Sequence, residues 1–369
     1  MGRAPHPSLH RGMPPLEPAP PLSRFEFWSP RWFYLPVWLW SLWLSLRHRS
    51  LLAPLVANPS FPAGGLVGES KGAILDMVGP EAARWFAPHV GVARGTGPVA
   101  ADVARALAAM GSASLAFPIV AKPDLGCRGV GVRPVTSADD LALYLADFPV
   151  GARLVLQQLV DWEGEAGVFW VRLPGADHGR IISLTLKYFP HVVGDGRSTL
   201  EALIRADPRA GQLPHLYLPR HAARLDEVLP EGRPFRLAFA GSHSRGAIFR
   251  DGTHLVTPAM EARFAAIADA IPEFWFGRFD VRFDDFADLA RGGNFRIVEV
   301  NGAGAEATHI WDSRKTLVEA YRSLFRQWGL LWEVGARNLA RGHRPEPLRA
   351  FLGRWKRERT LTPAYPESW

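Results

Sequence analysis

The chain has 369 residues, of which 47% are hydrophobic, and this is enough for one large or two to three ordinary domains with a real core. Its single cysteine, Cys127, excludes an internal disulfide. The formal net charge of +7 favours an anionic partner such as a nucleotide, a phosphate or an acidic lipid.

The N-terminal region divides into two segments of different composition. Residues 1–24 are rich in proline and lack the early apolar stretch of a secretory signal, so we expect a disordered leader. Residues 25–57 are rich in tryptophan, and we expect them to form a membrane-associated helical segment. The stretch from Trp32 to Leu46 contains no charged residue.

This stretch is short for a transmembrane span. A helix from Trp32 to Leu46 would be roughly 22 Å long, whereas the hydrocarbon core of a bilayer is about 30 Å thick. Tryptophan prefers the membrane interface, and the basic residues Arg47, His48 and Arg49 follow directly. The pattern therefore favours an interfacial or embedded helix, and the alternative is a helix that packs on the protein's own domain.

The rest of the chain has a mixed pattern of helices and strands. Residues 58–115 begin with a loop rich in glycine and proline and continue with helices near 71–86 and 100–110 around a short strand. Residues 116–335 alternate between strands and helices. Residues 336–369 are basic, and we expect a loosely held tail that binds no nucleic acid, because no aromatic binding platform accompanies it.

Four pieces of the region from 116 to 335 contain residues suited to chemistry. The first is "VAKPDLGCRGVGV", in which Lys122 ends a strand and Gly126, Gly129 and Gly131 follow. Glycines allow backbone N–H groups to surround phosphate oxygens, and the lysine adds a positive charge. The stretch lacks the Gly-Lys-Ser/Thr of a Walker motif, and an ordinary hairpin loop is the alternative.

The next two pieces are weaker when taken alone. In "VLQQLVDWEGEAGVFW", the strand edge at Gln157 and Gln158 could offer its backbone to an adenine, and Glu165 could hold ribose hydroxyls. Taken alone, this stretch favours a purely structural role. In "LKYFPHVVGDGRSTLEALI", Lys187 ends a strand, and a tight turn leads into a helix.

The fourth piece joins "FGRFDVRF" to "FRIVEVNGAGAEATH". Side chains two positions apart in a strand share a face, so Arg278 lies beside Asp280, and Glu299 lies beside Asn301. Carboxylate and amide oxygens are the ligands that Mg²⁺ prefers. This pair of strands predicts a magnesium site, and a structural salt bridge is the alternative.

In this order, the motifs "AKPDLGCRGVGV", "VVGDGRSTLEALI", "GRFDV" and "VEVNGAG" resemble those of the ATP-grasp superfamily. The similarity covers about residues 68–330 and is closest to the D-alanine–D-alanine ligase-like and cyanophycin-synthetase-like carboxylate–amine ligases. It implies an α+β fold in which two lobes with antiparallel sheets grip ATP, here preceded by an N-terminal hydrophobic helical segment.

The resemblance also implies roles for individual residues. It implies that Lys71 and Lys122 contact phosphates and that the glycines from 126 to 131 form a lid over them. The adenine and ribose positions fall on Gln157, Gln158 and Glu165. By the same resemblance, the catalytic cations are Lys187 at the γ-phosphate and Arg278 at the acyl-phosphate, and the ligands of Mg²⁺, which Mn²⁺ can replace, are Asp280, Glu299 and Asn301.

The function that follows is an ATP-dependent ligase that joins an unidentified carboxylate to an unidentified amine through an acyl-phosphate. We expect it in the cytoplasm, in peripheral contact with the inner face of the cell membrane. An ATP-grasp kinase and a non-catalytic nucleotide-binding adaptor are the rival hypotheses, and a homodimer is left open. Glu306 follows the metal motif, where an acidic residue would repel a carboxylate and favour an amine.

Overall fold

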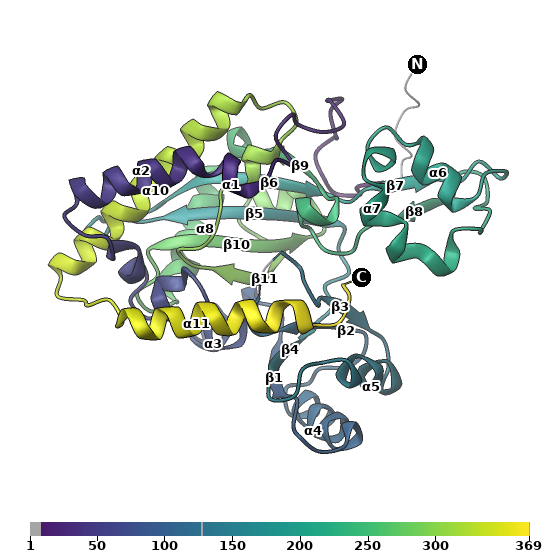
Figure 1. Ribbon diagram of the computed structural model, residues 1–369, viewed down its shortest axis with the longest axis horizontal. Coiled ribbons are helices and arrows are strands. Elements are labelled where there is room, and N and C mark those ends of the chain that lie inside the picture. The colour runs from purple at the N-terminus through teal and green to yellow at the C-terminus, as the bar shows by residue number, and fades with distance from the viewer. Residues whose placement is uncertain (1–8, 127, 369) are drawn as a thin grey trace.

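The computed structural model describes residues 9–126 and 128–368 (Figure 1). Its centre is an antiparallel five-stranded sheet in the order β11-β10-β5-β6-β9. Apolar side chains on both faces explain why this sheet is buried between helices. Its strands are β5 (Gly164–Val171), β6 (Arg180–Tyr188), β9 (Ile248–Asp251), β10 (Phe276–Phe283) and β11 (Phe295–Asn301).

The two faces of this sheet pack against different parts of the protein, because side chains alternate between the faces along each strand. On β10, Phe279 and Val281 enter the core that Phe264 of helix α8 (Pro258–Asp269) covers. The opposite face holds Phe276, which packs in a second core with Leu331 of helix α10 (Leu317–Ala340). Helix α10 covers only the part of this second face near Phe276. The polar residues of β10 follow farther along the strand on the same face.

A smaller antiparallel sheet, in the order β1-β4-β2-β3, forms a second lobe. Two helices cover it, and its core includes Met110, Leu141 and Tyr144. The two antiparallel sheets confirm the predicted α+β class. The elements of this lobe are β1 (His89–Ala93), α4 (Val99–Ser112), β2 (Ile119–Pro123), β3 (Arg133–Val135), α5 (Ala138–Ala146) and β4 (Arg153–Gln158).

Between β6 and β9 the chain forms a small third unit, seen in teal at the right of Figure 1. Its core contains Val192, Leu200 and Tyr217. Its elements are β7 (His191–Val193), α6 (Leu200–Ala206), α7 (Pro214–Tyr217) and β8 (Pro234–Arg236), and two further short helices of the chain are α3 (Lys71–Asp76) and α9 (Phe286–Ala290).

The expectation of a disordered leader is wrong for residues 9–24, whereas residues 1–8 lie outside the described residues. The leader lies along the large lobe and offers its carbonyl oxygens to donors there. Phe286 N donates to Gly12 O at 2.7 Å, and Tyr188 Oη donates to Pro14 O at 2.9 Å. Gly12 can approach this closely because it has no Cβ, which would collide with the backbone of Asp284.

The tryptophan-rich segment contains the helices α1 (Pro30–Phe33) and α2 (Leu35–Arg47). One face of α2 packs on the domain: Val37 and Leu44 are buried, and Trp40 Nε1 donates to Phe325 O of α10 at 3.0 Å. The other face is exposed and apolar. Among the described helices, none combines the length and the apolar content needed to cross a membrane.

The helix expected near 71–86 is much shorter, because Gly79 and Pro80 follow α3 and prevent its continuation. The expectation of a loose basic tail from 336 is also wrong. Helix α10 continues to Ala340, and α11 (Leu348–Leu361) crosses the molecule to the smaller lobe, in yellow in Figure 1. There the buried Tyr365 stacks on Phe148, with ring centroids 5.3 Å apart.

Candidate active site

Lys122 joins the two lobes at the centre of the candidate site. It lies one residue before the end of β2, and its Nζ donates to Gln157 Oε1 of β4 at 2.8 Å and to Val298 O of β11 at 2.7 Å. Burial lowers its pKa to about 8, while the nearby Glu299 carboxylate counteracts part of this shift. Since both of these acceptors are neutral, the buried lysine is well placed to bind an anionic ligand between the lobes.

A row of charged groups crosses the large sheet from β6 to β10. Lys187 Nζ donates to Glu165 Oε1 at 3.0 Å and to Asp280 Oδ1 at 2.9 Å. Burial opposes the charge of Lys187, but these two carboxylates more than offset it and raise its pKa. Arg282 Nε lies 3.0 Å from Glu165 Oε2 on the other side. The strand register produces this row, because Glu165 is opposite both Lys187 and Arg282.

Gly167 of β5 leaves space above this row. It lies opposite Asp280 in the sheet, and a Cβ at this position would meet Arg278 Cδ at 3.0 Å and Asp280 Oδ1 at 3.3 Å. Arg278 uses that space to pair with Asp280 through Nε at 2.9 Å and through a terminal nitrogen at 3.0 Å. The missing side chain therefore leaves room for Arg278 beside Asp280.

The candidate metal ligands are next to one another at the junction of β10 and β11. Asp280 is paired in register with Glu299, and Asn301 Nδ2 lies 3.4 Å from Asp280 Oδ2. Burial opposes ionisation of Asp280, but Arg278 and Lys187 outweigh it and hold the pKa of Asp280 well below its usual range. An ionised carboxylate beside a second carboxylate and a carboxamide side chain is a donor set that fits Mg²⁺.

These residues line a cavity of about 610 Å³ that lies between the two sheets. Most of the residues predicted for the site are in its wall. They are Lys122, Gly129, Gln157, Gln158, Glu165, Lys187, Arg278, Asp280, Glu299 and Asn301.

Three predicted residues lie outside this wall. Lys71 Nζ donates to Gly126 O and lies 3.7 Å from Glu299 Oε1, so it holds the glycine loop beside the metal ligands. Gly131 N donates to Ser368 Oγ at 2.9 Å and thus ties the loop to the C-terminal segment. Cys127, which follows Gly126 in the same loop, lies outside the described residues.

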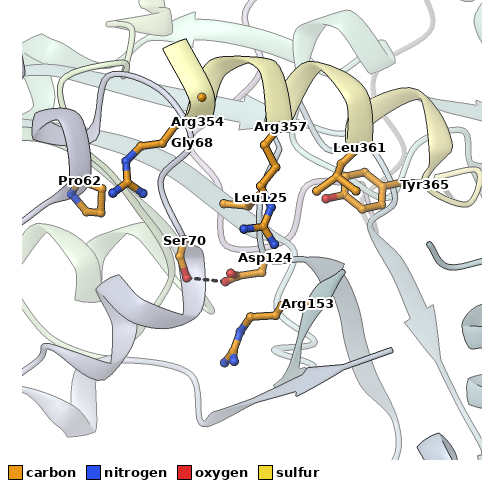
Figure 2. Close-up of a pocket in the computed structure, with 11 residues that line it drawn as sticks. Pro62, Gly68, Ser70, Asp124, Leu125, Arg153, Arg354, Arg357, Leu361 and Tyr365 are labelled. Atoms are coloured by element: carbon orange, nitrogen blue, oxygen red, sulfur yellow. Dashed lines mark hydrogen bonds between the residues drawn. The ribbon is translucent and has the colours of Figure 1, made fainter. Parts of the chain in front are cut away.

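A second cavity of about 390 Å³ lies between α11 and the end of β2 (Figure 2). In its wall, Asp124 Oδ1 accepts hydrogen bonds from Ser70 Oγ at 2.8 Å and from Gly72 N at 2.9 Å. These bonds fix the first turn of α3 and so position Lys71. The arginines in Figure 2, Arg153, Arg354 and Arg357, give this cavity a basic rim.

The sequence did not reveal two further residues at the site. Tyr34 of the tryptophan-rich segment reaches the main cavity, where its hydroxyl donates to Glu306 Oε2. Glu69 Oε2 accepts a hydrogen bond from Gly302 N at 3.0 Å, and burial raises the pKa of Glu69 to about 8. Only the position of Glu69 two residues before Lys71 could have indicated it.

Two histidines near the motifs have structural partners. His309 Nδ1 and Ser183 Oγ lie 2.6 Å apart, while His309 Nε2 and Ser323 Oγ lie 3.0 Å apart. Burial lowers the pKa of His309, so the ring stays neutral between two hydroxyls. His191 Nδ1 donates to Phe189 O at 2.9 Å, and its ring is edge-on to that of His10, with the centroids 5.5 Å apart. Neither ring lines the main cavity.

Comparisons with known proteins leave the family open. No protein-family model matches the chain, and no curated protein matches it. Among solved structures, one similar chain is a bifunctional glutathione synthetase from Pasteurella multocida, with 15% identity and a TM-score of 0.31 over 72% of this chain and 38% of that one.

Two further solved structures are similar to a comparable degree. D-cycloserine synthetase DcsG shows 15% identity and a TM-score of 0.37 over 70% of each chain. VanG D-Ala:D-Ser ligase from Enterococcus faecalis shows 13% identity and a TM-score of 0.37 over 76% of this chain and 64% of that one. The chain thus matches well under half the length of the first structure and about two thirds of the other two. All three are synthetases or ligases by title, and at such low TM-scores the likeness assigns neither a family nor a function.

Proposed function

We propose that the protein is an ATP-dependent carboxylate–amine ligase of the ATP-grasp type that works at the cytoplasmic face of a membrane. The observation that carries this proposal is the meeting of two sheets at one cavity. The smaller lobe contributes Lys122, and the large sheet contributes Lys187, Arg278, Asp280 and Glu299. Such a set of cations and oxygen ligands suits a nucleoside triphosphate with its metal ion.

The roles of the residues follow from charge and position. Asp280, Glu299 and Asn301 would hold Mg²⁺ or Mn²⁺, which would supply charge neutralisation at the phosphates. Lys122 and Lys71 would attract the phosphate oxygens of ATP, and the adenosine would lie along Gln157, Gln158 and Glu165. Fixed cations stabilise developing charge without reorganising, and this is the main contribution that a protein makes to phosphoryl transfer.

The proposed chemistry has two steps. A carboxylate oxygen of the first substrate attacks the γ-phosphorus, the bond to the β-phosphate oxygen breaks, and ADP leaves with the electron pair. Lys187 and Arg278 stabilise the acyl-phosphate that forms. The amine nitrogen of the second substrate then attacks the acyl carbon, and phosphate leaves, so an amide remains.

The test is release of ADP from the full-length protein with Mg²⁺-ATP and pools of carboxylic acids and amines. We expect release that depends on a pool and disappears in Glu299→Gln, with amide and free phosphate as products. A phosphorylated substrate without amide would show a kinase instead. Nucleotide binding without ADP release from any acid and amine pair would contradict the ligase proposal.

The proposed membrane contact rests on the exposed face of the tryptophan-rich segment. A stripe at helical spacing faces outward, from Trp32, which is 73% exposed, to Leu46, which is 72% exposed. Contiguous exposed apolar surface marks an interaction site. The flanking Arg31, Arg47 and Arg49 are exposed as well, which favours an anionic lipid surface as the partner. The stripe consists of Trp32, Leu35, Trp38, Leu39, Leu42 and Leu46.

Sedimentation with lipid vesicles tests this contact without damaging the fold. Deleting the whole segment would remove the buried Phe25 and Phe33, so exposed residues are changed instead. We expect the double variant Leu39→Gln/Leu42→Gln to bind vesicles containing phosphatidylglycerol roughly tenfold or more weakly than the unaltered protein. The matched control is Leu348→Gln/Leu352→Gln, on the exposed face of α11. Equal binding by all three proteins would contradict the membrane proposal. So would a dimer that the unaltered protein forms without lipid and that Leu39→Gln/Leu42→Gln does not form.

A further inference from the structure

Around Glu306 the wall of the main cavity is aromatic, and we call this part of the cavity the aromatic compartment. The tryptophan-rich segment forms one side of this compartment with Phe27, Trp28 and Tyr34. Trp311 and Trp328 form other parts of its wall. This compartment is distinct in character from the charged half of the cavity, where lysines and carboxylates predominate.

Among the acidic side chains in the described lining of the cavity, Glu306 is the only one that forms no ion pair with a lysine or arginine. Its Oε2 accepts from the Tyr34 hydroxyl, and its Oε1 accepts from Trp311 Nε1 at 2.7 Å. The other carboxylates of the lining pair with lysine or arginine. Two neutral donors thus orient Glu306 without neutralising it, and each oxygen keeps a free acceptor position.

Tyr34 remains a donor at any ordinary pH. Burial and the neighbouring Glu306 carboxylate raise the pKa of Tyr34 well above its usual value. Arg278 also reaches this side of the cavity, where one of its terminal nitrogens donates to the backbone oxygen of Glu306 at 3.0 Å. Because Arg278 pairs with Asp280 as well, it links the compartment directly to the candidate metal site.

The mouth of the compartment is apolar and open. Trp28 is 48% exposed and Phe27 is 44% exposed, although both line the cavity. They precede α1, and the outward-facing stripe on α1 and α2 begins only four residues after Trp28, at Trp32. An apolar surface therefore runs from the outside of the segment into the cavity.

We propose that this compartment is the acceptor site, that its ligand is a primary amine carried on an apolar chain or ring, and that Glu306 holds the ammonium group; this inference rests on the ligase function proposed above. The aromatic wall removes the apolar part from water and attracts the cation through the ring faces. A carboxylate ligand would be repelled by Glu306.

The amide-forming step balances with the groups present. The bound ammonium passes one proton to Glu306, and the nitrogen lone pair attacks the acyl carbon of the acyl-phosphate. The carbon–nitrogen bond forms, the bond from carbon to the phosphate oxygen breaks, and the phosphate leaves with that electron pair. The second proton lost by the nitrogen leaves with the phosphate.

Calorimetric titration of the full-length protein in Mg²⁺-ADP tests the acceptor site directly. The probes are ethylamine, hexylamine, hexanol and hexanoate. We expect hexylamine to bind at least about tenfold more tightly than ethylamine, because of its longer chain. Hexylamine should also bind about tenfold more tightly than hexanol or hexanoate, because only the amine pairs with Glu306.

Three variants separate the two parts of the site. Glu306→Gln should weaken hexylamine about tenfold and leave ADP binding unchanged. Trp28→Ala should weaken hexylamine but not ethylamine. The control Trp355→Ala removes an exposed tryptophan of α11 that does not line the cavity, and it should change neither affinity.

The outcomes distinguish this inference from the proposed function. Hexanoate that binds as tightly as hexylamine, or hexylamine binding that Glu306→Gln leaves intact, would overturn the amine site even if ADP binds. Absence of ADP and ATP binding would overturn the ligase proposal, and the amine titrations without nucleotide would still decide what the compartment accepts.

Discussion

Lys187 is almost completely buried and touches two carboxylates, so its charge cannot be removed without consequence. In Lys187→Met, Glu165 and Asp280 lose their common donor, and the transferred phosphoryl group would lose a cation. We expect ADP release to fall by roughly 100-fold or more and the free energy of unfolding to fall by about 3 kcal/mol. Urea unfolding and ADP release measure the two effects separately.

Lys315 supplies the control for this substitution. It pairs with Asp251 at 2.7 Å, is partly exposed and does not line the cavity. Lys315→Met should cost less than about 1 kcal/mol of stability and leave ADP release nearly unchanged. Unchanged turnover in Lys187→Met would refute a catalytic role for that lysine.

Lys122 gives the site a pH dependence with two opposite trends. Because its pKa in the folded protein is about 8, it loses its charge as pH rises through 8, and ATP should then bind less tightly, by up to about tenfold per pH unit. In the unfolded chain the same lysine has its ordinary pKa of 10.5. Between pH 8 and 10.5 the unfolded chain therefore binds more protons than the folded protein, and the free energy of unfolding rises with pH in this range.

Titrations from pH 6.5 to 9.5 can detect both trends for Lys122. ATP affinity should be flat below about pH 7.5 and fall above pH 8. Lys122→Gln should bind ATP more weakly throughout and lose the dependence, because a glutamine does not titrate. A wild-type affinity that stays constant to pH 9.5 would show that Lys122 does not contact the phosphates.

Among the elements, strand β5 is where a small change should have a large local effect. A Cβ in Gly167→Ala would press on Arg278 and Asp280 without touching the apolar core on the other face. We expect ADP release to fall about tenfold, because displacing these two side chains misplaces the reacting groups. The urea concentration at the unfolding midpoint should change little.

A second glycine provides the comparison for β5. Gly329 lies in α10, and a Cβ there would meet no atom of residues 9–126 and 128–368 within 4 Å. Gly329→Ala should therefore stabilise the protein by about 0.5–1 kcal/mol and leave ADP release as it was. If Gly167→Ala retained full turnover, the space above Asp280 would not matter for the reaction.

At the scale of elements, alternation predicted the strands well. The pairing of "FGRFDV" with "FRIVEVN" could be predicted because polar residues on alternate positions, at a strand end, mark one face. The contact between Tyr34 and Glu306 could not, because these residues are 272 positions apart and only packing of α2 on α10 brings them together. The ordered leader and the C-terminal helix are not predictable from the sequence for the same reason, since composition alone does not reveal the surface on which a segment packs.

Across the whole molecule, the C-terminal segment acts as a brace between the lobes. Glu358 Oε2 accepts a hydrogen bond from Gly68 N at 2.8 Å, and Tyr365 enters the core of the smaller lobe. Tyr365→Ala should lower the free energy of unfolding by about 3 kcal/mol, because it leaves a cavity in that core, and should weaken ATP binding by loosening the glycine loop.

Trp355 of the same segment is the matched control for Tyr365, since it is an aromatic residue of α11 that faces solvent. Trp355→Ala should lower stability by no more than about 0.5 kcal/mol. Urea unfolding and ATP titration of both variants provide the comparison. Equal stability of the two variants would show that the smaller lobe folds without the brace.

The short stretch from Trp28 to Tyr34 has an evolutionary consequence. Within seven residues it contributes to the outer surface at Trp32, to the core at Phe33 and to the cavity at Trp28 and Tyr34. Selection on one of these surfaces therefore constrains the others. Among homologous sequences, changes at Tyr34 should be accompanied by changes at Glu306, whereas Leu39 and Leu42 should drift freely among apolar residues.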